Sequence, residues 1–159
     1  MSDPVSVPVL VGELNPYGPD PSFALYDEPE NSSGGRLRRV VLGIPRRAYL
    51  ALPRYNLCSG SWSLRAARAR AAEVDAIHPD GTLVLLGRKV QAAFGVPPST
   101  PQFTRAACVR LGNRLRYVLL PHPSGLCREW NSPAAVSRAR LVVAEAFPEW
   151  SAVLGFRVP

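Results

Sequence analysis

The chain has 159 residues, of which 47% are hydrophobic and 19% charged, as expected for one globular domain with an ordinary core. Its three cysteines (Cys58, Cys108 and Cys127) form no CxxC pair, which argues against a disulfide framework and against a metal or cluster site. The net charge of +7 favours contact with a polyanion such as nucleic acid, although an arginine-rich coding bias would produce the same excess.

Hydropathy and the N-terminal residues predict a cytoplasmic protein. No apolar run is long enough to span a bilayer. The segment Met1–Pro4 lacks the basic start and apolar stretch of a secretory signal. We therefore expect a cytoplasmic monomer without membrane contact.

The first half of the chain predicts two strands and three helices. Val7–Val11 is an apolar run that ends at Gly12, which is typical of a buried strand stopping at a turn. Polar loops are expected over Asn15–Asp20 and Asp27–Gly35, helices over Arg36–Leu42, Pro45–Leu52 and Trp62–Val74, and a second strand over Tyr55–Cys58.

The second half predicts two more strands and two more helices. Thr82–Leu86 is an apolar strand that ends at Gly87, and Arg116–Leu120 is another that enters the sequence Pro-His-Pro-Ser-Gly. Helices are expected over Arg88–Phe94 and Ser132–Phe147, with a proline-rich loop over Val96–Gln102.

Short buried strands that alternate with helices predict an α/β fold. We expect one domain over residues 1–159 with a three-layer α/β/α fold. Its middle layer is a short, mainly parallel, four-stranded sheet. Ligands of such sheets bind at the carboxyl edge, where three strands run into polar segments: Gly12–Gly18, Asn56–Cys58 and His122–Leu126. Neither GxGxxG nor GxxxxGK[ST] is present, so dinucleotide and P-loop sites have no motif support.

In that order, these three segments resemble the motifs of the uracil-DNA glycosylase superfamily. Asn15-Pro16-Tyr17, preceded by Gly12-Glu13, resembles the first motif, Asn56 the second, and His122-Pro123-Ser124-Gly125-Leu126 the last. Val84–Gly87 and the following helix with Gln91 and Ala92 also resemble the central strand and helix of the family, so the likeness extends from about Val7 to Ala144. The chain departs from the best-known branch in two ways: an extra residue before Asn15, and Asn in place of the catalytic Asp, as in the mismatch-specific and hypoxanthine-directed branches.

The resemblance implies a DNA glycosylase that works without a cofactor. Such an enzyme flips a uracil-type or otherwise modified base out of single-stranded or mismatched DNA and hydrolyses its N-glycosidic bond. His122 would contact the carbonyl of the departing base, and Asn15 would position the water. Glu13, the nearest carboxylate, can activate that water, which Asn15 cannot do as a base.

The remaining predicted site residues bind the base or the DNA. Base-binding positions are Asn56, Tyr17, Tyr26 and Phe23, and DNA-binding positions are Ser124, Leu126 and Arg128. Leu126 matches the wedge that enters the space left by the flipped base. Structural roles remain open for each: His122 can cap its loop, Asn15 and Asn56 can order turns, and Leu126 can pack beneath its own loop.

Two other functions fit the same sequence. A related hydrolase would cleave free nucleosides or nucleotides. A catalytically weak protein on this scaffold would only bind a base or DNA, since a fold does not fix a function.

Overall fold

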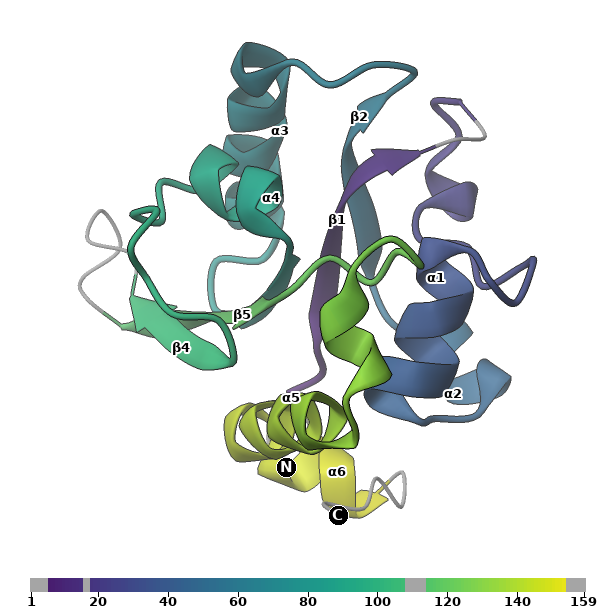
Figure 1. Ribbon diagram of the computed structural model, residues 1–159. Coiled ribbons are helices and arrows are strands. Elements are labelled where there is room, and N and C mark those ends of the chain that lie inside the picture. The colour runs from purple at the N-terminus through teal and green to yellow at the C-terminus, as the bar shows by residue number, and fades with distance from the viewer. Residues whose placement is uncertain (1–5, 16–17, 108–113, 154–159) are drawn as a thin grey trace.

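The computed structural model describes residues 6–15, 18–107 and 114–153 (Figure 1). The described chain forms one mixed sheet of five strands in the order β2-β1-β3-β5-β4. The strands are β1 (Val9–Asn15), β2 (Arg54–Ser59), β3 (Leu83–Leu86), β4 (Thr104–Ala107) and β5 (Leu115–Leu120). The pairs β2–β1, β1–β3 and β3–β5 are parallel, whereas β4 is antiparallel to β5. The α/β class is therefore confirmed.

The prediction of a four-stranded sheet is wrong, because β4 adds a fifth strand at one edge. Its sequence, Thr-Arg-Ala-Ala, has no apolar run, and its residues are half-buried or exposed. An edge strand has one neighbour only, so it does not need the continuous apolar sequence of a central parallel strand. The hydrogen bond from the Phe103 N–H to the Leu119 carbonyl (2.7 Å) begins the pairing.

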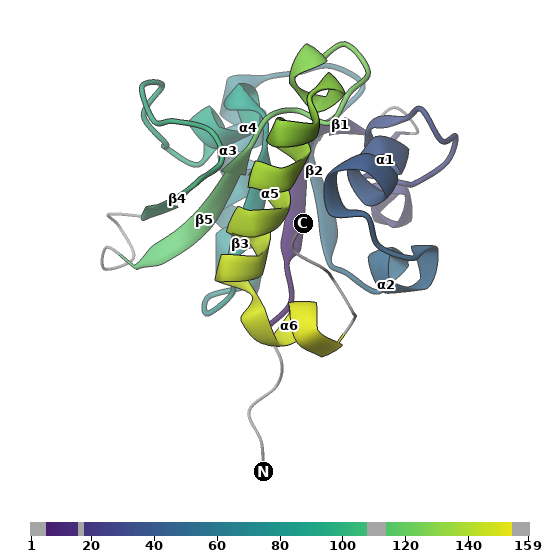
Figure 2. The same ribbon diagram turned by 60° about the horizontal axis from the view of Figure 1, so that its bottom comes forward.

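Helices cover both faces of the sheet (Figures 1 and 2). The α-helices are α1 (Ser33–Arg36), α2 (Arg46–Leu50), α3 (Leu64–Ile77), α4 (Arg88–Ala93), α5 (Pro133–Ala146) and α6 (Pro148–Val153). Shorter pieces are the 3₁₀ turns η1 (Pro21–Phe23) and η4 (Arg128–Asn131) and the π-helix η2 (Leu37–Leu42), which continues α1. None of the described helices has the length and apolarity required to cross a membrane.

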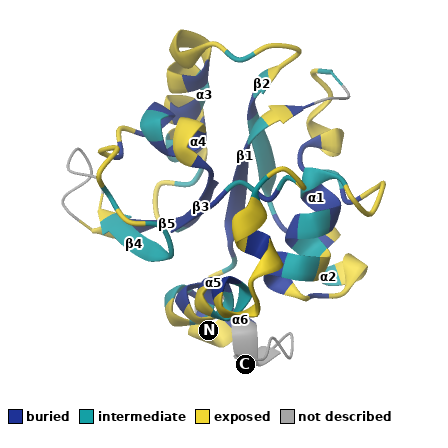
Figure 3. Cartoon of the chain, in the orientation of Figure 1, coloured by how far each residue is buried: buried dark blue, intermediate teal, exposed yellow. Residues whose placement is uncertain are grey.

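Alternating residues of the central strands divide the core into two halves. Leu10, Val84 and Val118 face η2, α2, α5 and α6, while Val9 and Leu85 face α3 and α4. Figure 3 shows the resulting pattern, with buried central strands and helices whose outer faces are exposed. This alternation follows from the two-residue period of a strand, and it explains why all positions of β3 are buried.

Two predicted boundaries near the carboxyl edge are wrong. Strand β1 does not stop at Gly12 but continues to Asn15, because β2 runs beside it and pairs Leu14 with Cys58 and Asn15 with Ser59. The helix expected from Arg36 begins at Ser33 instead. Its cap is Ser32, whose hydroxyl accepts a hydrogen bond from the Gly35 N–H (3.1 Å).

Candidate functional site

A cavity of about 490 Å³ opens at the carboxyl edge of the sheet. Parallel pairing places the ends of β1, β2, β3 and β5 at this edge, so residues far apart in the chain meet there. Seven of the predicted site residues line the cavity: Glu13, Phe23, Tyr26, Asn56, His122, Ser124 and Leu126. Its volume suits a small ring-shaped ligand.

Two of the other predicted site residues, Asn15 and Arg128, do not line this cavity. Asn15 is buried, and its side-chain amide donates to the Asp20 carbonyl (3.1 Å), as in the turn-ordering alternative. It lines a separate hollow of about 200 Å³ on the other side of Asn56. Arg128 is exposed at the start of η4 and does not line the cavity, and Tyr17 falls outside the described residues.

His122 follows β5 directly, and its loop holds the ring in one orientation. The Ser124 N–H donates to Nδ1 (3.1 Å), which leaves the proton of the neutral imidazole on Nε2. The indole of Trp130 donates to the His122 carbonyl (2.9 Å). Burial lowers the pKa of His122, and the opposing effect of Glu13 on that pKa is smaller. His122 is therefore a neutral Nε2–H donor at neutral pH.

Glu13 reaches the cavity from β1 and lies between two cationic or potentially cationic groups. Its Oε2 is 3.6 Å from His122 Nε2, and its Oε1 is 3.3 Å from Lys89 Nζ. The Glu13 side chain is 23% exposed, so water can reach the carboxylate. Lys89 was not among the predicted site residues, although its place three residues after the end of β3 puts it at the same sheet edge.

Asn56 on β2 lines the cavity, and Gly12 on β1 leaves space for its side-chain oxygen. These two residues are paired across β1 and β2, and a Cβ on Gly12 would lie 2.5 Å from Asn56 Oδ1 and 2.6 Å from Leu25 Cδ2. Among the described residues, nothing donates a hydrogen bond to the buried Oδ1 of Asn56. A buried acceptor without a hydrogen-bond donor lowers the stability of the folded state, because it has lost its hydrogen bonds to water.

Phe23 and Tyr26 form an aromatic wall with their rings edge to face, 5.3 Å between centroids. Between them Leu25 adopts a left-handed backbone (φ 49°), which is strained for a leucine. Hydrogen bonds from side chains outside the segment hold Ala24 and Leu25 in this conformation. The Tyr49 hydroxyl donates to the Leu25 carbonyl, and Arg54 donates to the Ala24 carbonyl (3.2 Å). Burial raises the pKa of Tyr49, so its hydroxyl keeps the proton that it donates.

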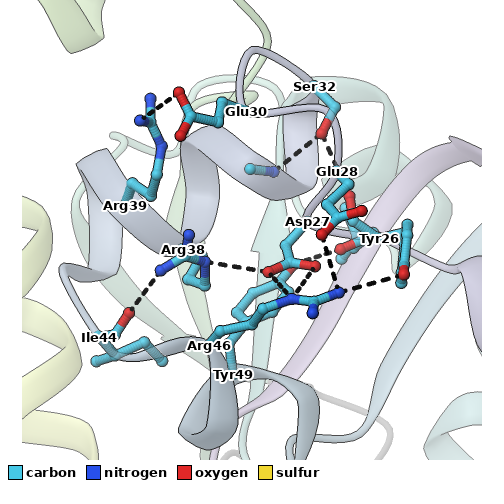
Figure 4. Close-up of polar contacts among 12 residues, drawn as sticks. Tyr26, Asp27, Glu28, Glu30, Ser32, Arg38, Arg39, Ile44, Arg46 and Tyr49 are labelled. Carbon is cyan, nitrogen blue, oxygen red and sulfur yellow. Dashed lines mark hydrogen bonds and ion pairs between the residues drawn. The ribbon is translucent and has the colours of Figure 1, made fainter.

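Asp27 anchors the aromatic wall to the helices behind it (Figure 4). Its side chain is 1% exposed, and Arg46 Nε donates to both carboxylate oxygens (3.2 and 3.0 Å). Arg38 Nε lies 3.1 Å from the same carboxylate. Arg46 also donates to the Tyr26 hydroxyl (3.2 Å), so a single guanidinium links the buried charge to the wall of the cavity.

The start of α1 completes the cavity, and sequence analysis missed it. Ser32, Ser33 and Gly34 line the wall opposite the sheet, and the Ser32 hydroxyl donates to the Tyr26 carbonyl (3.3 Å). A Cβ on Gly34 would overlap the carbonyl oxygens of Leu25 and Tyr26. The signal was present in the run Ser-Ser-Gly-Gly before a helix, which combines an N-cap with small residues for close approach.

The loop after His122 forms the mouth of the cavity. Arg36 on α1 donates to the Pro123 carbonyl (3.2 Å) and holds the loop against the helix. Leu126 is 94% exposed, so it does not pack beneath its own loop. An isolated exposed leucine at the rim of a cavity is available for contact with a ligand.

Comparison with known proteins identifies no relative. No family model matches the chain, and no curated protein or solved structure matches it. The resemblance to the uracil-DNA glycosylase superfamily therefore rests on the three motifs and on the Val84–Gly87 strand with its following helix. In residues 6–15, 18–107 and 114–153, no three His, Cys, Asp or Glu side chains come together as a metal site.

Proposed function

We propose that this chain is a DNA glycosylase, which binds a flipped uracil-type or otherwise modified base in the carboxyl-edge cavity and hydrolyses its N-glycosidic bond. The observation that carries the proposal is the fixed imidazole of His122. Its Nε2–H lies beside Glu13 in a cavity that also contains the Asn56 amide and two aromatic rings. This combination supplies the donor, the carboxylate and the ring-stacking surface that base excision requires.

Cleavage of the glycosidic bond leaves negative charge on the base and positive charge on the sugar. A preorganised N–H donor stabilises the anion, and His122 supplies one without having to reorient. Glu13, the sole carboxylate among the described residues that line the cavity, orients the attacking water. Asn15 does not line this cavity, and its side-chain amide donates to the Asp20 carbonyl.

Base recognition and DNA contact use the rest of the lining. Asn56 lines the cavity, and its amide carries both a donor and an acceptor for the Watson–Crick edge of a flipped base. Phe23 and Tyr26 flank the ring. Leu126 at the mouth enters the gap in the base stack, and the net charge of +7 attracts the phosphates. One chain surrounds the cavity, so we expect a monomer to suffice.

The test is excision from labelled oligonucleotides that carry uracil, hypoxanthine, xanthine or hydroxymethyluracil, either single-stranded or mismatched. Alkali then converts each abasic site into a strand break. We expect His122→Ala to lower the excision rate by at least about 100-fold, since it removes the donor that stabilises the leaving base. His78→Ala is the matched control, because His78 precedes β3 at the opposite edge of the sheet and should leave the rate unchanged.

Each alternative function has its own outcome in this experiment. Salt-sensitive DNA binding without strand breaks on any substrate would replace the proposal by a base- or DNA-binding protein. Release of free base from nucleosides or nucleotides, without DNA binding, would indicate the small-molecule N-glycosidase instead.

A further inference from the structure

Lys89 stands out because it is the only lysine among 19 basic residues, and it lies beside the proposed catalytic pair. It belongs to the first turn of α4, and its Nζ is 3.3 Å from Glu13 Oε1. The same ammonium lies 5.7 Å from the centre of the Trp62 ring. The turn before α4 is tight: Gly87 has a φ of 94°, and a Cβ there would be 3.2 Å from His122 Cβ. Lys89 is thus held near His122 by the backbone.

Glu13 creates an electrostatic difficulty for base excision. Its Oε2 lies 3.6 Å from His122 Nε2, the atom that must donate to the leaving base. An uncompensated carboxylate at this distance would compete for the Nε2–H, and it would oppose the negative charge that develops on the base. The site therefore needs a positive group that acts on Glu13 rather than on the base.

We propose that Lys89 is a positioning residue, which draws the Glu13 carboxylate to its own side and compensates its charge, so that His122 remains neutral and free to donate from Nε2. The catalytic role of Lys89 rests on the proposed function. The contact between Lys89 and Glu13, and its effect on His122, can be measured whether or not the protein excises a base. The charged groups near His122 are Glu13 from β1, Lys89 from α4 and Arg36 from α1, which binds the neighbouring Pro123 carbonyl.

The protonation of His122 reports on this arrangement. Burial lowers the pKa of His122, Glu13 raises it and Lys89 lowers it. Loss of the ammonium should therefore raise the pKa of His122, both directly and because the released carboxylate can move closer. Loss of the carboxylate should lower it. General loosening of the site would expose the imidazole and raise the pKa of His122 in both variants. The fall expected on loss of the carboxylate therefore distinguishes the proposed arrangement from loosening.

The decisive experiment is an NMR titration of the imidazole protons, which is simple because the chain has two histidines. We expect Lys89→Met to raise the pKa of His122 by roughly half a unit, Lys89→Arg to leave it near the wild-type value, and Glu13→Gln to lower it. His78 serves as the internal reference. The matched control is Arg88→Met, which removes a charge from the same helix turn, where Arg88 binds the carbonyls of Pro98 and Thr100. An unchanged or lowered pKa of His122 in Lys89→Met, or an Arg88→Met variant with the same rise, would overturn the proposal.

Excision kinetics give a second readout. Lys89→Met should lower the single-turnover rate about tenfold with DNA affinity changed less than about twofold, and Lys89→Arg should restore most of the rate. The loss should be smaller in a Glu13→Gln background, because Lys89 acts largely through Glu13. Equal losses in both backgrounds, or no rescue by arginine, would contradict this role. A wild-type protein without any excision would overturn the proposed function, and the titration would still decide the role of Lys89.

Discussion

At the scale of single residues, the surroundings of His122 select its neutral form. Its Nδ1 accepts a hydrogen bond from the Ser124 N–H. Protonation of Nδ1 would break this bond and bring two N–H donors together. Burial adds a second cost, because a charged imidazole loses hydration in the cavity wall. The pKa of His122 is lowered by this burial, and the pKa of His78 is lowered as well.

This shift predicts how stability depends on pH. In the unfolded chain the imidazole titrates near pH 6.5, above its folded pKa, so below pH 6.5 the unfolded state binds more protons. The free energy of unfolding should therefore fall as the pH drops through about 6.5, and level off below the folded pKa. Urea unfolding of wild type and His122→Gln between about pH 5.5 and 7.5 measures this, and the variant should show a flatter dependence. The slope that remains in the variant belongs to His78, and equal slopes in both proteins would contradict the assignment.

At the scale of elements, the segment from Phe23 to Asp27 is a short wall that needs external support. It contains a left-handed leucine and only the last residue of the 3₁₀ turn η1, so it has few backbone hydrogen bonds of its own. Support comes from α2 and η2 through Arg46 and Arg38, whose guanidinium groups meet at the buried Asp27. The wall of the cavity therefore depends on an ion-pair cluster behind it.

Asp27→Asn should lower the free energy of unfolding by about 1–3 kcal/mol, because a neutral amide leaves two guanidinium groups without their buried partner. Tyr26 should also lose its orientation, so the affinity for substrate should fall. The matched control is Glu30→Gln, where the Glu30 side chain is 75% exposed and pairs with Arg39. An exposed pair contributes about 0–1 kcal/mol, so this variant should be near wild type in urea unfolding. Similar losses in the two variants would show that burial of Asp27 is unimportant.

At the scale of the whole molecule, the two edges of the sheet have different tasks. The carboxyl edge holds the cavity, whereas the amino edge is closed by Arg116, which is fully buried. Its guanidinium donates to the carbonyls of Pro79 (2.7 Å), Gly81 (3.2 Å), Asp75 (3.0 Å) and His78 (2.6 Å), and to the Asp75 carboxylate (3.2 Å). These contacts satisfy the end of α3 and the turn into β3.

Arg116→Met should separate stability from function. We expect the free energy of unfolding to fall by roughly 3 kcal/mol or more, since the fully buried guanidinium is removed and several partly buried carbonyls lose their donor at once. The folded fraction should keep the excision rate and the wild-type pKa of His122, because no part of the cavity lies at that edge. Urea unfolding measures the change in stability, and excision assays at urea concentrations below the unfolding midpoint measure the activity of the folded variant. A fall in excision rate without loss of stability would show that the two edges are coupled.

Much of this architecture was accessible from the sequence alone. The three central strands, β1, β3 and β5, are covered by helices on both faces, which favours nearly continuous apolar runs such as Leu83–Leu86. Parallel pairing then forces their carboxyl ends to one edge, whatever the details of packing. That rule was sufficient to bring Glu13, Asn56 and His122 together in one predicted site, and the structure places all three on one cavity.

The tertiary structure alone decided the rest, since those features depend on groups that are distant in the sequence. The sequence does not show that β2 extends β1 to Asn15, that the Asn15 amide binds the Asp20 carbonyl outside the cavity, or that Lys89 meets Glu13 across two elements. The edge strand β4 and the Ser32–Gly34 wall are likewise defined by their neighbours. Local patterns determine which segments are buried and where strands end, whereas the partner of each polar group is determined only when distant segments pack within a few ångströms of one another.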